Sequence, residues 1–196
     1  MNLLEFLAEL PEDWVLAPIY KKDAPMKSGK LATGKNPFEP SFEKPFNKHD
    51  ATLAFEKNPT LAAVGLFTGI RGNGYVILDV DKNLGVLKRK FGQTLDGAPD
   101  IESTRANAAK YIFKVPEALW GEVSGFSHSD EHADGYEVLW GAQGLVFGAY
   151  PGSNDGKWPV GTYGFEGDPK VVPVAQNKGY DLKQLLIGGS PFGESL

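Results

Sequence analysis

Glycine and proline divide this chain into short pieces, which limits what it can fold into. The 196 residues include 24 glycines and 14 prolines, and these fall between short apolar runs. Because both residues interrupt regular structure, we expect short helices and strands joined by many turns. The runs predict strands at 14–20, 62–67, 75–80, 102–104, 109–115, 136–140, 145–150 and 161–165. Helices are predicted at 2–10, 50–57, 83–91 and 180–187, so the fold class is α+β.

Three turns are predicted between neighbouring strands. Gly72-Asn73-Gly74 is typical of a hairpin turn and comes just before the strand at 75–80. Ala106-Asn107 predicts a turn between the strands at 102–104 and 109–115. The glycine-containing segment 141–144 predicts that its two flanking strands pair with each other.

The composition excludes several classes of protein. The chain has no cysteine, which rules out a disulfide framework, a cysteine nucleophile and a cysteine zinc site. The formal net charge of −5 argues against a protein whose main function is non-specific binding to nucleic acid. No stretch approaches about 18 apolar residues, and the start has acids but no basic segment. We therefore expect a cytoplasmic protein with no secretory signal and no membrane partner.

Residues 21–48 stand out by their charge. They carry seven lysines against three acidic residues, although the whole chain is negative. They show no helix or strand period, so we expect a long irregular loop, which is usually functional or mobile. Its phenylalanines either stack on nucleic-acid bases or anchor the loop to the core; they are Phe38, Phe42 and Phe46. The whole pattern predicts one domain over residues 1–188 and a flexible tail over 189–196.

The sharpest local feature is an apolar strand that runs into two carboxylates. In Tyr75-Val-Ile-Leu-Asp79-Val-Asp81, the two aspartates are two positions apart, so they lie on one face of a strand. Two carboxylates on one face repel each other unless a cation lies between them, and Mg²⁺ and Mn²⁺ prefer such oxygen ligands. The alternative is a strand that ends in solvent with two acids in the following loop.

A third carboxylate is predicted in another strand. Glu137 lies in the apolar run 136–140, where its side chain faces either solvent or a site. Together with Asp79 and Asp81 on adjacent strands, it would suit a two-metal site for nucleotidyl transfer. The alternative for Glu137 is an ordinary exposed glutamate on a strand.

Two cations near small residues are candidates for binding phosphate. Arg105 and Lys110 flank Ala106-Asn107-Ala108-Ala109, and small side chains let a phosphate approach the backbone. The alternative is a surface hairpin with ordinary solvated cations.

Over residues 14–165, the order of these strands, loops and short motifs along the chain resembles that in a known family. This family is the N-terminal domain of bifunctional DNA primase/polymerases (prim-pol), in the archaeo-eukaryotic primase superfamily. The match consists of short motifs, none of them specific alone. They are Gly34-Lys35-Asn36-Pro37, Val64-Gly65-Leu66-Phe67-Thr68-Gly69, Leu78-Asp79-Val80-Asp81, Tyr111-Ile-Phe-Lys-Val-Pro116, Glu137 with Gln143-Gly144, Pro151-Gly152-Ser153 and Tyr163-Gly164-Phe165.

The chain departs from this family at one motif. The family has S-x-H, whose histidine contacts the phosphates of the incoming nucleotide, and this chain has Ala108-Ala109-Lys110. Lysine binds phosphate as a point charge, but it does not act as a neutral imidazole near pH 7. The sequence therefore resembles a variant branch of the family, such as those of phage or plasmid replication proteins.

The resemblance implies a primase-polymerase fold, with an RRM-like antiparallel sheet core and an N-terminal αβ module. It implies a nucleotidyltransferase that makes or extends primers on single-stranded DNA, with Mg²⁺ or Mn²⁺ held by Asp79, Asp81 and Glu137. Nucleoside triphosphates would be bound by Lys110, Arg105, Gln143, Gly144 and Ser153. In the basic loop, Lys35, Lys44 and Lys48 would contact the DNA template. A replicative helicase is a further expected partner.

Three other functions stay open at this point. The chain is alternatively a catalytically degenerate prim-pol domain that binds nucleotide or DNA in a replication complex. A nuclease or phosphohydrolase would use the same carboxylates. In a purely structural protein, we expect Asp79→Asn and Asp81→Asn to be neutral or stabilising, because charge repulsion is relieved.

Overall fold

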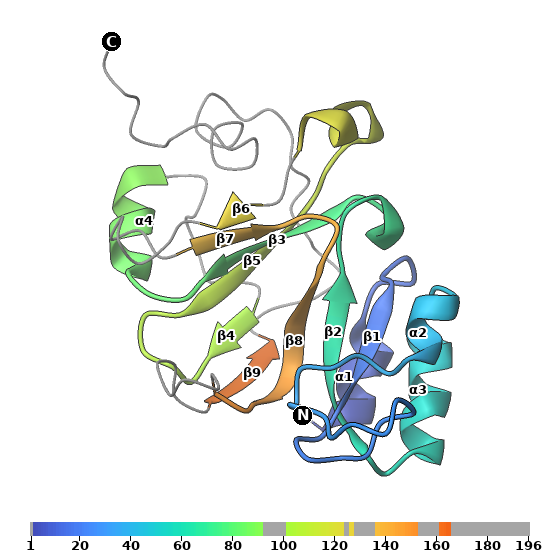
Figure 1. Ribbon diagram of the computed structural model, residues 1–196. Coiled ribbons are helices and arrows are strands. Elements are labelled where there is room, and N and C mark those ends of the chain that lie inside the picture. The colour runs from blue at the N-terminus through green and yellow to red at the C-terminus, as the bar shows by residue number, and fades with distance from the viewer. Residues whose placement is uncertain (1, 92–100, 124–125, 128–135, 153–160, 166–196) are drawn as a thin grey trace.

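The protein is described here by a computed structural model, which places residues 2–91, 101–123, 126–127, 136–152 and 161–165 (Figure 1). The predicted helix at 180–187, the tail at 189–196 and Ser153 lie outside these residues. The fold is α+β with antiparallel sheets, as predicted. In the described part of the chain, no helix is long and apolar enough to cross a membrane.

The elements are short, as the glycine and proline content predicts. The helices are α1 (Leu3–Glu9), α2 (Pro40–Glu43), α3 (Lys48–Lys57) and α4 (Leu84–Phe91), with 3-10 turns η1 (Ile70–Gly72) and η3 (Glu117–Glu122). The strands are β1 (Leu16–Tyr20), β2 (Leu61–Phe67), β3 (Tyr75–Val80), β4 (Ile101–Ser103), β5 (Ala109–Lys114), β6 (Phe126–Ser127), β7 (Tyr136–Leu139), β8 (Gln143–Tyr150) and β9 (Gly161–Phe165).

Strand β8 joins the two sheets of the molecule. The strands follow the order β1-β2-β8-β9-β4-β5-β3-β7-β6, with antiparallel pairing throughout. The first part of β8 pairs with β2 and its last part, from Gly148, pairs with β9. Gly148 has a φ of 107°, and a Cβ there would lie 2.7 Å from the Cβ of Ala63. A glycine is therefore required where the strand changes partners.

Two of the three predicted turns do not make the predicted pairings. After β2, the chain forms η1 and a left-handed Asn73 (φ 55°), and β3 then pairs with β5 and β7, not with β2. Strands β7 and β8 also pair with different partners, β3 and β2, so the predicted pair around 141–144 is wrong. The turn at Ala106-Asn107 is confirmed, because β4 pairs with β5 and Asn107 is left-handed (φ 60°).

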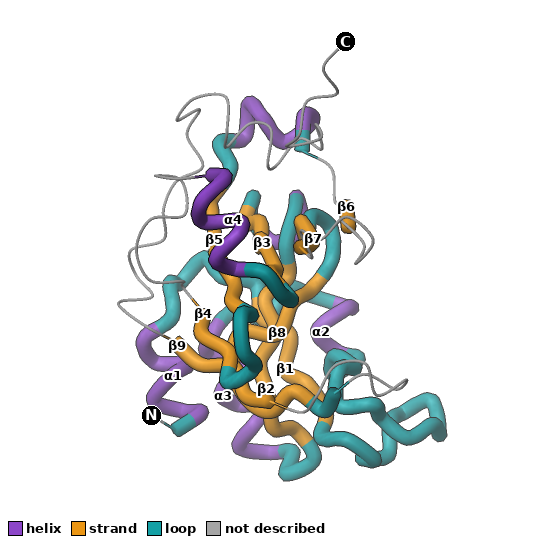
Figure 2. The backbone as a smooth tube through the Cα atoms, turned by 90° about the vertical axis from the view of Figure 1, so that its left-hand side faces the viewer, coloured by secondary structure: helices purple, strands orange, loops and turns teal. Residues whose placement is uncertain are grey.

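Helices α1 and α3 lie beside β1, β2 and β8, and α4 lies beside β3 and β5 (Figure 2). Helix α1 begins with a capping box between Asn2 and Glu5, and its Phe6 stacks on Phe147 of β8 with the ring centroids 4.3 Å apart. Helix α3 begins at Lys48, two residues before the predicted start, because the Asn47 side chain accepts from the Asp50 N–H. Helix α4 packs its buried Leu87 against the side of β3 that carries Val76, Leu78 and Val80.

The basic segment 21–48 is held to the core and is not wholly irregular. It contains α2, and the buried Phe46 packs in a cluster with Tyr20 and the partly buried Phe38. The Tyr20 hydroxyl donates to Glu39 at 2.5 Å, and the Lys27 N–H also donates to Glu39 at 3.0 Å. Phe38 and Phe46 therefore anchor this segment to the core. Phe42 is half-exposed and packs against Phe67 and Arg71.

The hydrogen bond between Tyr20 and Glu39 stabilises the packing of segment 21–48 on the core, and its contribution depends on pH. Burial raises the pKa of Glu39, but the hydrogen bonds from the Tyr20 hydroxyl and from backbone N–H groups, together with the Lys27 charge, outweigh burial and leave the pKa below the ordinary 4.5. Burial and Glu39 raise the pKa of Tyr20 to about 12. A lowered carboxyl pKa stabilises the fold above pH 4.5, and this is lost as the pH falls through the lowered value. We expect Tyr20→Phe to lower the free energy of unfolding by about 1 kcal/mol at pH 7 and by less at pH 3. Urea denaturation at both values measures this, and an equal loss at both would contradict it.

Candidate functional site

Three charged side chains form a row across adjacent strands. In the register of the sheet, Asp79 of β3 lies directly opposite Lys110 of β5 on one side and Glu137 of β7 on the other. Directly opposite residues on one face have Cβ atoms about 5 Å apart. Asp81 follows Asp79 by two positions and shares its face. The register therefore brings a cation and three carboxylates together from separate parts of the sequence.

The alternation along β3 explains why the carboxylates face inward. Val76, Leu78 and Val80 pack in the cluster under α4, whereas Tyr75 and Ile77 pack on the other face, in the core shared with α1, β1, β2 and β8. The two aspartates continue this second face beyond the end of the packed core. Apolar packing on both faces of β3 thus fixes their direction.

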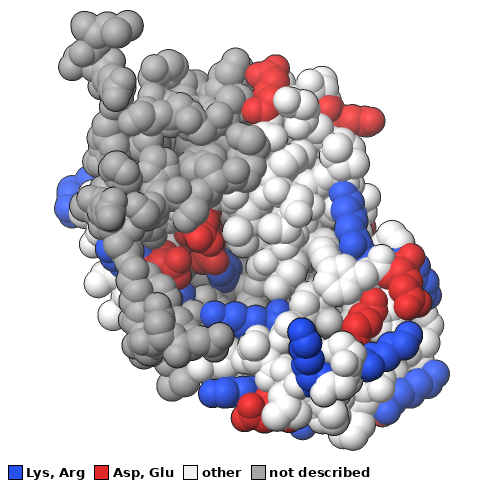
Figure 3. Space-filling view, viewed as in Figure 1, with Lys and Arg blue, Asp and Glu red and all other residues white. Residues whose placement is uncertain are grey.

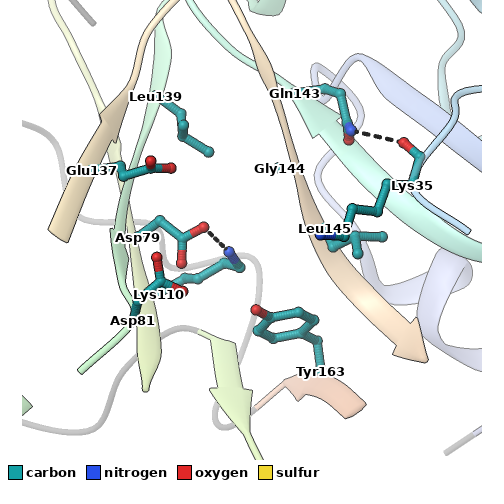
Figure 4. A pocket seen from close by; sticks show the side chains of 10 residues that line it. All are labelled: Lys35, Asp79, Asp81, Lys110, Glu137, Leu139, Gln143, Gly144, Leu145 and Tyr163. Atoms are coloured by element: carbon teal, nitrogen blue, oxygen red, sulfur yellow. Dashed lines mark hydrogen bonds and ion pairs between the residues drawn. The ribbon is translucent and has the colours of Figure 1, made fainter. Parts of the chain in front are cut away.

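A pocket of about 280 Å³ lies in front of this row (Figure 4). One wall carries the row itself and Leu139, and the opposite wall comes from β8, β9 and the basic segment. The lining residues are Lys35, Asp79, Asp81, Lys110, Glu137, Leu139, Gln143, Gly144, Leu145 and Tyr163. In the space-filling view, acidic and basic side chains lie next to each other where the surface is hollowed (Figure 3). The pocket thus joins residues from both sheets and from the segment 21–48.

Lys110 is paired with Asp79 inside the protein. Its side chain is 2% exposed, its ammonium contacts Asp79 Oδ2, and it lies 4.7 Å from the ring centroid of Tyr163. Burial by itself would lower the pKa of Lys110, but Asp79, Tyr163 and Asp81 together outweigh burial and the pKa is raised. The ammonium is therefore charged at neutral pH and neutralises Asp79.

A second cation holds Asp81. Arg105 is buried, and its Nη2 lies 3.2 Å from Asp81 Oδ1 and donates to the Tyr163 hydroxyl at 2.6 Å. Burial and the nearby Asp79 raise the pKa of Asp81, although Arg105 and Lys110 oppose the shift. Arg105 lies beside the pocket and not among its lining residues, so it supports Asp81 at this site.

Two residues of the site were not predicted to have a role. Tyr163 lies between the two cations, and the only sign of it in the sequence was the aromatic pattern of the last strand. Gly65 leaves room for the Gln143 side chain, because a Cβ at Gly65 would lie 2.2 Å from Gln143 Oε1. The Gln143 Nε2 in turn donates to the Lys35 carbonyl at 3.3 Å, which ties the basic segment to β8.

Two of the lysines predicted to bind DNA lie outside this pocket. Lys44 pairs with Asp50 at 3.0 Å. Lys48 pairs with Glu12 at 2.7 Å and donates to the carbonyls of Ala8 and Leu10, at the end of α1. These contacts give Lys48 a structural role between α1 and α3. Of the three lysines predicted to bind DNA, Lys35 is the one that lines the pocket.

The donor set fits an oxygen-ligated cation only in part. Among the described residues, no group of three or more histidine, cysteine, aspartate or glutamate side chains is arranged to hold a metal ion. However, Asp79 Oδ1 is buried and has no hydrogen-bond partner in the described part of the chain. Asp81 and Glu137 line the same pocket, and carboxylate oxygens are what Mg²⁺ and Mn²⁺ prefer. The residues thus fit one divalent cation, while the Lys110 ammonium occupies the other side of Asp79.

The comparisons with known proteins add no family to this description. The sequence matches no protein-family model, and it has no significant match among curated proteins.

Proposed function

We propose that this protein is a metal-dependent nucleotidyltransferase of the primase-polymerase type, which makes or extends primers on single-stranded DNA. One observation carries the proposal: residues that the prim-pol resemblance singled out in separate motifs line a single pocket. They are Lys35, Asp79, Asp81, Lys110, Glu137, Gln143 and Gly144. The two-sheet α+β architecture is compatible with the primase-polymerase fold, which forms part of the proposal.

The pocket residues suggest how the reaction would be supported. The 3′-hydroxyl oxygen of the primer bonds to the α-phosphorus of the nucleotide, the bond to the bridging oxygen breaks, and pyrophosphate leaves. Lys35 and Lys110 line the pocket: Lys35 would attract the phosphates, and Lys110, paired with Asp79, would reduce the negative charge that they meet. The proton of the attacking hydroxyl passes to solvent, because the three carboxylates of the pocket would hold the cation.

Mg²⁺ or Mn²⁺ would be held by Asp79, Asp81 and Glu137, and it would neutralise phosphate charge and lower the pKa of the attacking hydroxyl. Among the described residues at this site, Lys110 and Arg105 do not supply net positive charge for a triphosphate, because they are already paired with Asp79 and Asp81. The proposal therefore requires a divalent cation for nucleotide binding.

A second candidate is a nucleotide- or DNA-binding module that has lost catalysis. The same two ion pairs favour it, because they neutralise the carboxylates that would otherwise attract metal ions. This candidate predicts affinity for nucleotide or single-stranded DNA without turnover.

The test is labelled-nucleotide incorporation on single-stranded and primed DNA, with Mg²⁺ and then Mn²⁺. We expect incorporation by the wild type and a loss of about 100-fold in Glu137→Gln, which keeps the shape of the side chain and removes its charge. Glu56→Gln, an exposed position on α3, is the matched control and should keep full activity.

The other outcomes separate the alternatives. Binding without incorporation by the folded wild type favours the binding module. Degradation of DNA without added nucleotides, also lost in Glu137→Gln, favours a phosphohydrolase.

A further inference from the structure

Lys110 is held against Asp79 by the sheet itself. The two residues are register partners on β5 and β3, and Ile112 opposite Ile77 continues the same pairing. The Lys110 side chain is 2% exposed and Asp79 is 14% exposed. Unlike the side chain of a surface lysine, this one is enclosed within the fold beside its register partner.

The Lys110 ammonium occupies space and charge that a metal ion would otherwise take. It contacts Asp79 Oδ2, while Asp79 Oδ1 remains without a hydrogen-bond partner among the described residues. Tyr163 lies below it, with the Lys110 nitrogen 4.7 Å from the ring centroid. A divalent ion bound at Oδ2 would meet a like charge at contact distance in a buried setting, where repulsion is poorly screened.

The carboxylates away from Lys110 leave room for one ion. Asp79, Asp81 and Glu137 line the pocket, and one Asp81 oxygen is held by Arg105. Asp79 Oδ1 is the buried oxygen that Lys110 does not contact. The three carboxylates carry three negative charges, and Lys110 and Arg105 carry two positive ones. One divalent ion therefore gives the site a net charge of +1. A second ion would raise this excess to three charges.

We infer that Lys110 takes the place of one metal ion, so that the pocket binds one divalent cation and the lysine supplies the remaining positive charge. This inference rests on the proposed function, because it concerns the metal site of the same pocket. It predicts that removing the ammonium opens a second metal position beside Asp79.

The test counts Mn²⁺ ions bound to the full chain, by the electron paramagnetic resonance signal of free Mn²⁺ during a titration. We expect one ion for the wild type, two for Lys110→Met and one for Lys110→Arg. Lys114→Met is the matched control, because Lys114 lies on the same face of β5 but pairs with Asp13 outside the pocket. It should bind one ion.

Two ions or none in the wild type would overturn the inference, and so would a folded Lys110→Met that binds one ion with unchanged affinity. The wild-type count decides the question even where Lys110→Met does not fold, as checked by circular dichroism. One bound ion without nucleotide incorporation would refute the proposed function and leave this inference standing. Nucleotide incorporation by a wild type that binds two ions would support the proposed function and refute this inference.

Discussion

Asp79→Ala is expected to lower the free energy of unfolding by about 3–5 kcal/mol, whatever the protein's activity. The reason is Lys110, whose side chain is 2% exposed and whose ammonium has Asp79 as its ion-pair partner. Without the carboxylate, the buried charge loses its compensation, and the protein must deprotonate it or bring water to it. Urea denaturation at pH 7 measures the loss.

The control for this prediction removes both charges together. In Asp79→Leu/Lys110→Met, no ion is left buried, so we expect a stability close to that of the wild type or above it. Asp81→Asn should cost less than Asp79→Ala, because Arg105 keeps its hydrogen bond to the Tyr163 hydroxyl. If Asp79→Ala stays within about 1 kcal/mol of the wild type, Asp79 does not stabilise the buried Lys110 ammonium.

Because Asp79 is paired with the buried Lys110, substitutions of Asp79 change stability as well as activity. The sequence alone suggested that Asp79→Asn would be neutral or stabilising in a purely structural protein, because Asp79 and Asp81 repel each other. That expectation omits Lys110, which lies opposite Asp79 in the sheet. A loss of activity in an Asp79 variant therefore includes a loss of folded protein, and Glu137→Gln is the sharper probe of chemistry.

Local patterns predicted the elements of the site well. The apolar run Tyr75–Leu78 is visible in the sequence, and the two-residue spacing of Asp79 and Asp81 places both on one face of a strand, whose two faces are buried. Lys110 and Glu137 were also assigned to strands, because each lies within a short apolar run. These predictions succeed because the two-residue period of a strand is a local property.

Partners between strands could not be predicted in the same way. The hairpin expected at Gly72-Asn73-Gly74 does not form, and β3 pairs with β5 and β7 in place of β2. The choice depends on packing between residues far apart in the chain, which no local turn pattern encodes. The ion pairs of Asp79 and Asp81 follow from this topology, so they could not be foreseen either.

Gly72→Ala is the second substitution with a large expected effect, about 3 kcal/mol of destabilisation. A Cβ at Gly72 would lie 2.0 Å from the carbonyl oxygen of Phe67 and 2.5 Å from its carbonyl carbon. Both are backbone atoms, so no side-chain rotation relieves the clash. Phe67 pairs with Gln143 of the pocket and its N–H bonds to Val15, so moving it disturbs β2 on both sides.

The matched control for Gly72→Ala is Gly121→Ala. Gly121 also lies in a 3-10 turn, but it is exposed and a Cβ there would have no neighbour within 4 Å. Its replacement should change the free energy of unfolding by less than about 0.5 kcal/mol. Thermal and urea unfolding of both variants measure the difference. Equal stability of the two would mean that the η1 turn moves away from Phe67 at little cost, and that Gly72 serves, as the sequence suggested, only as a turn residue.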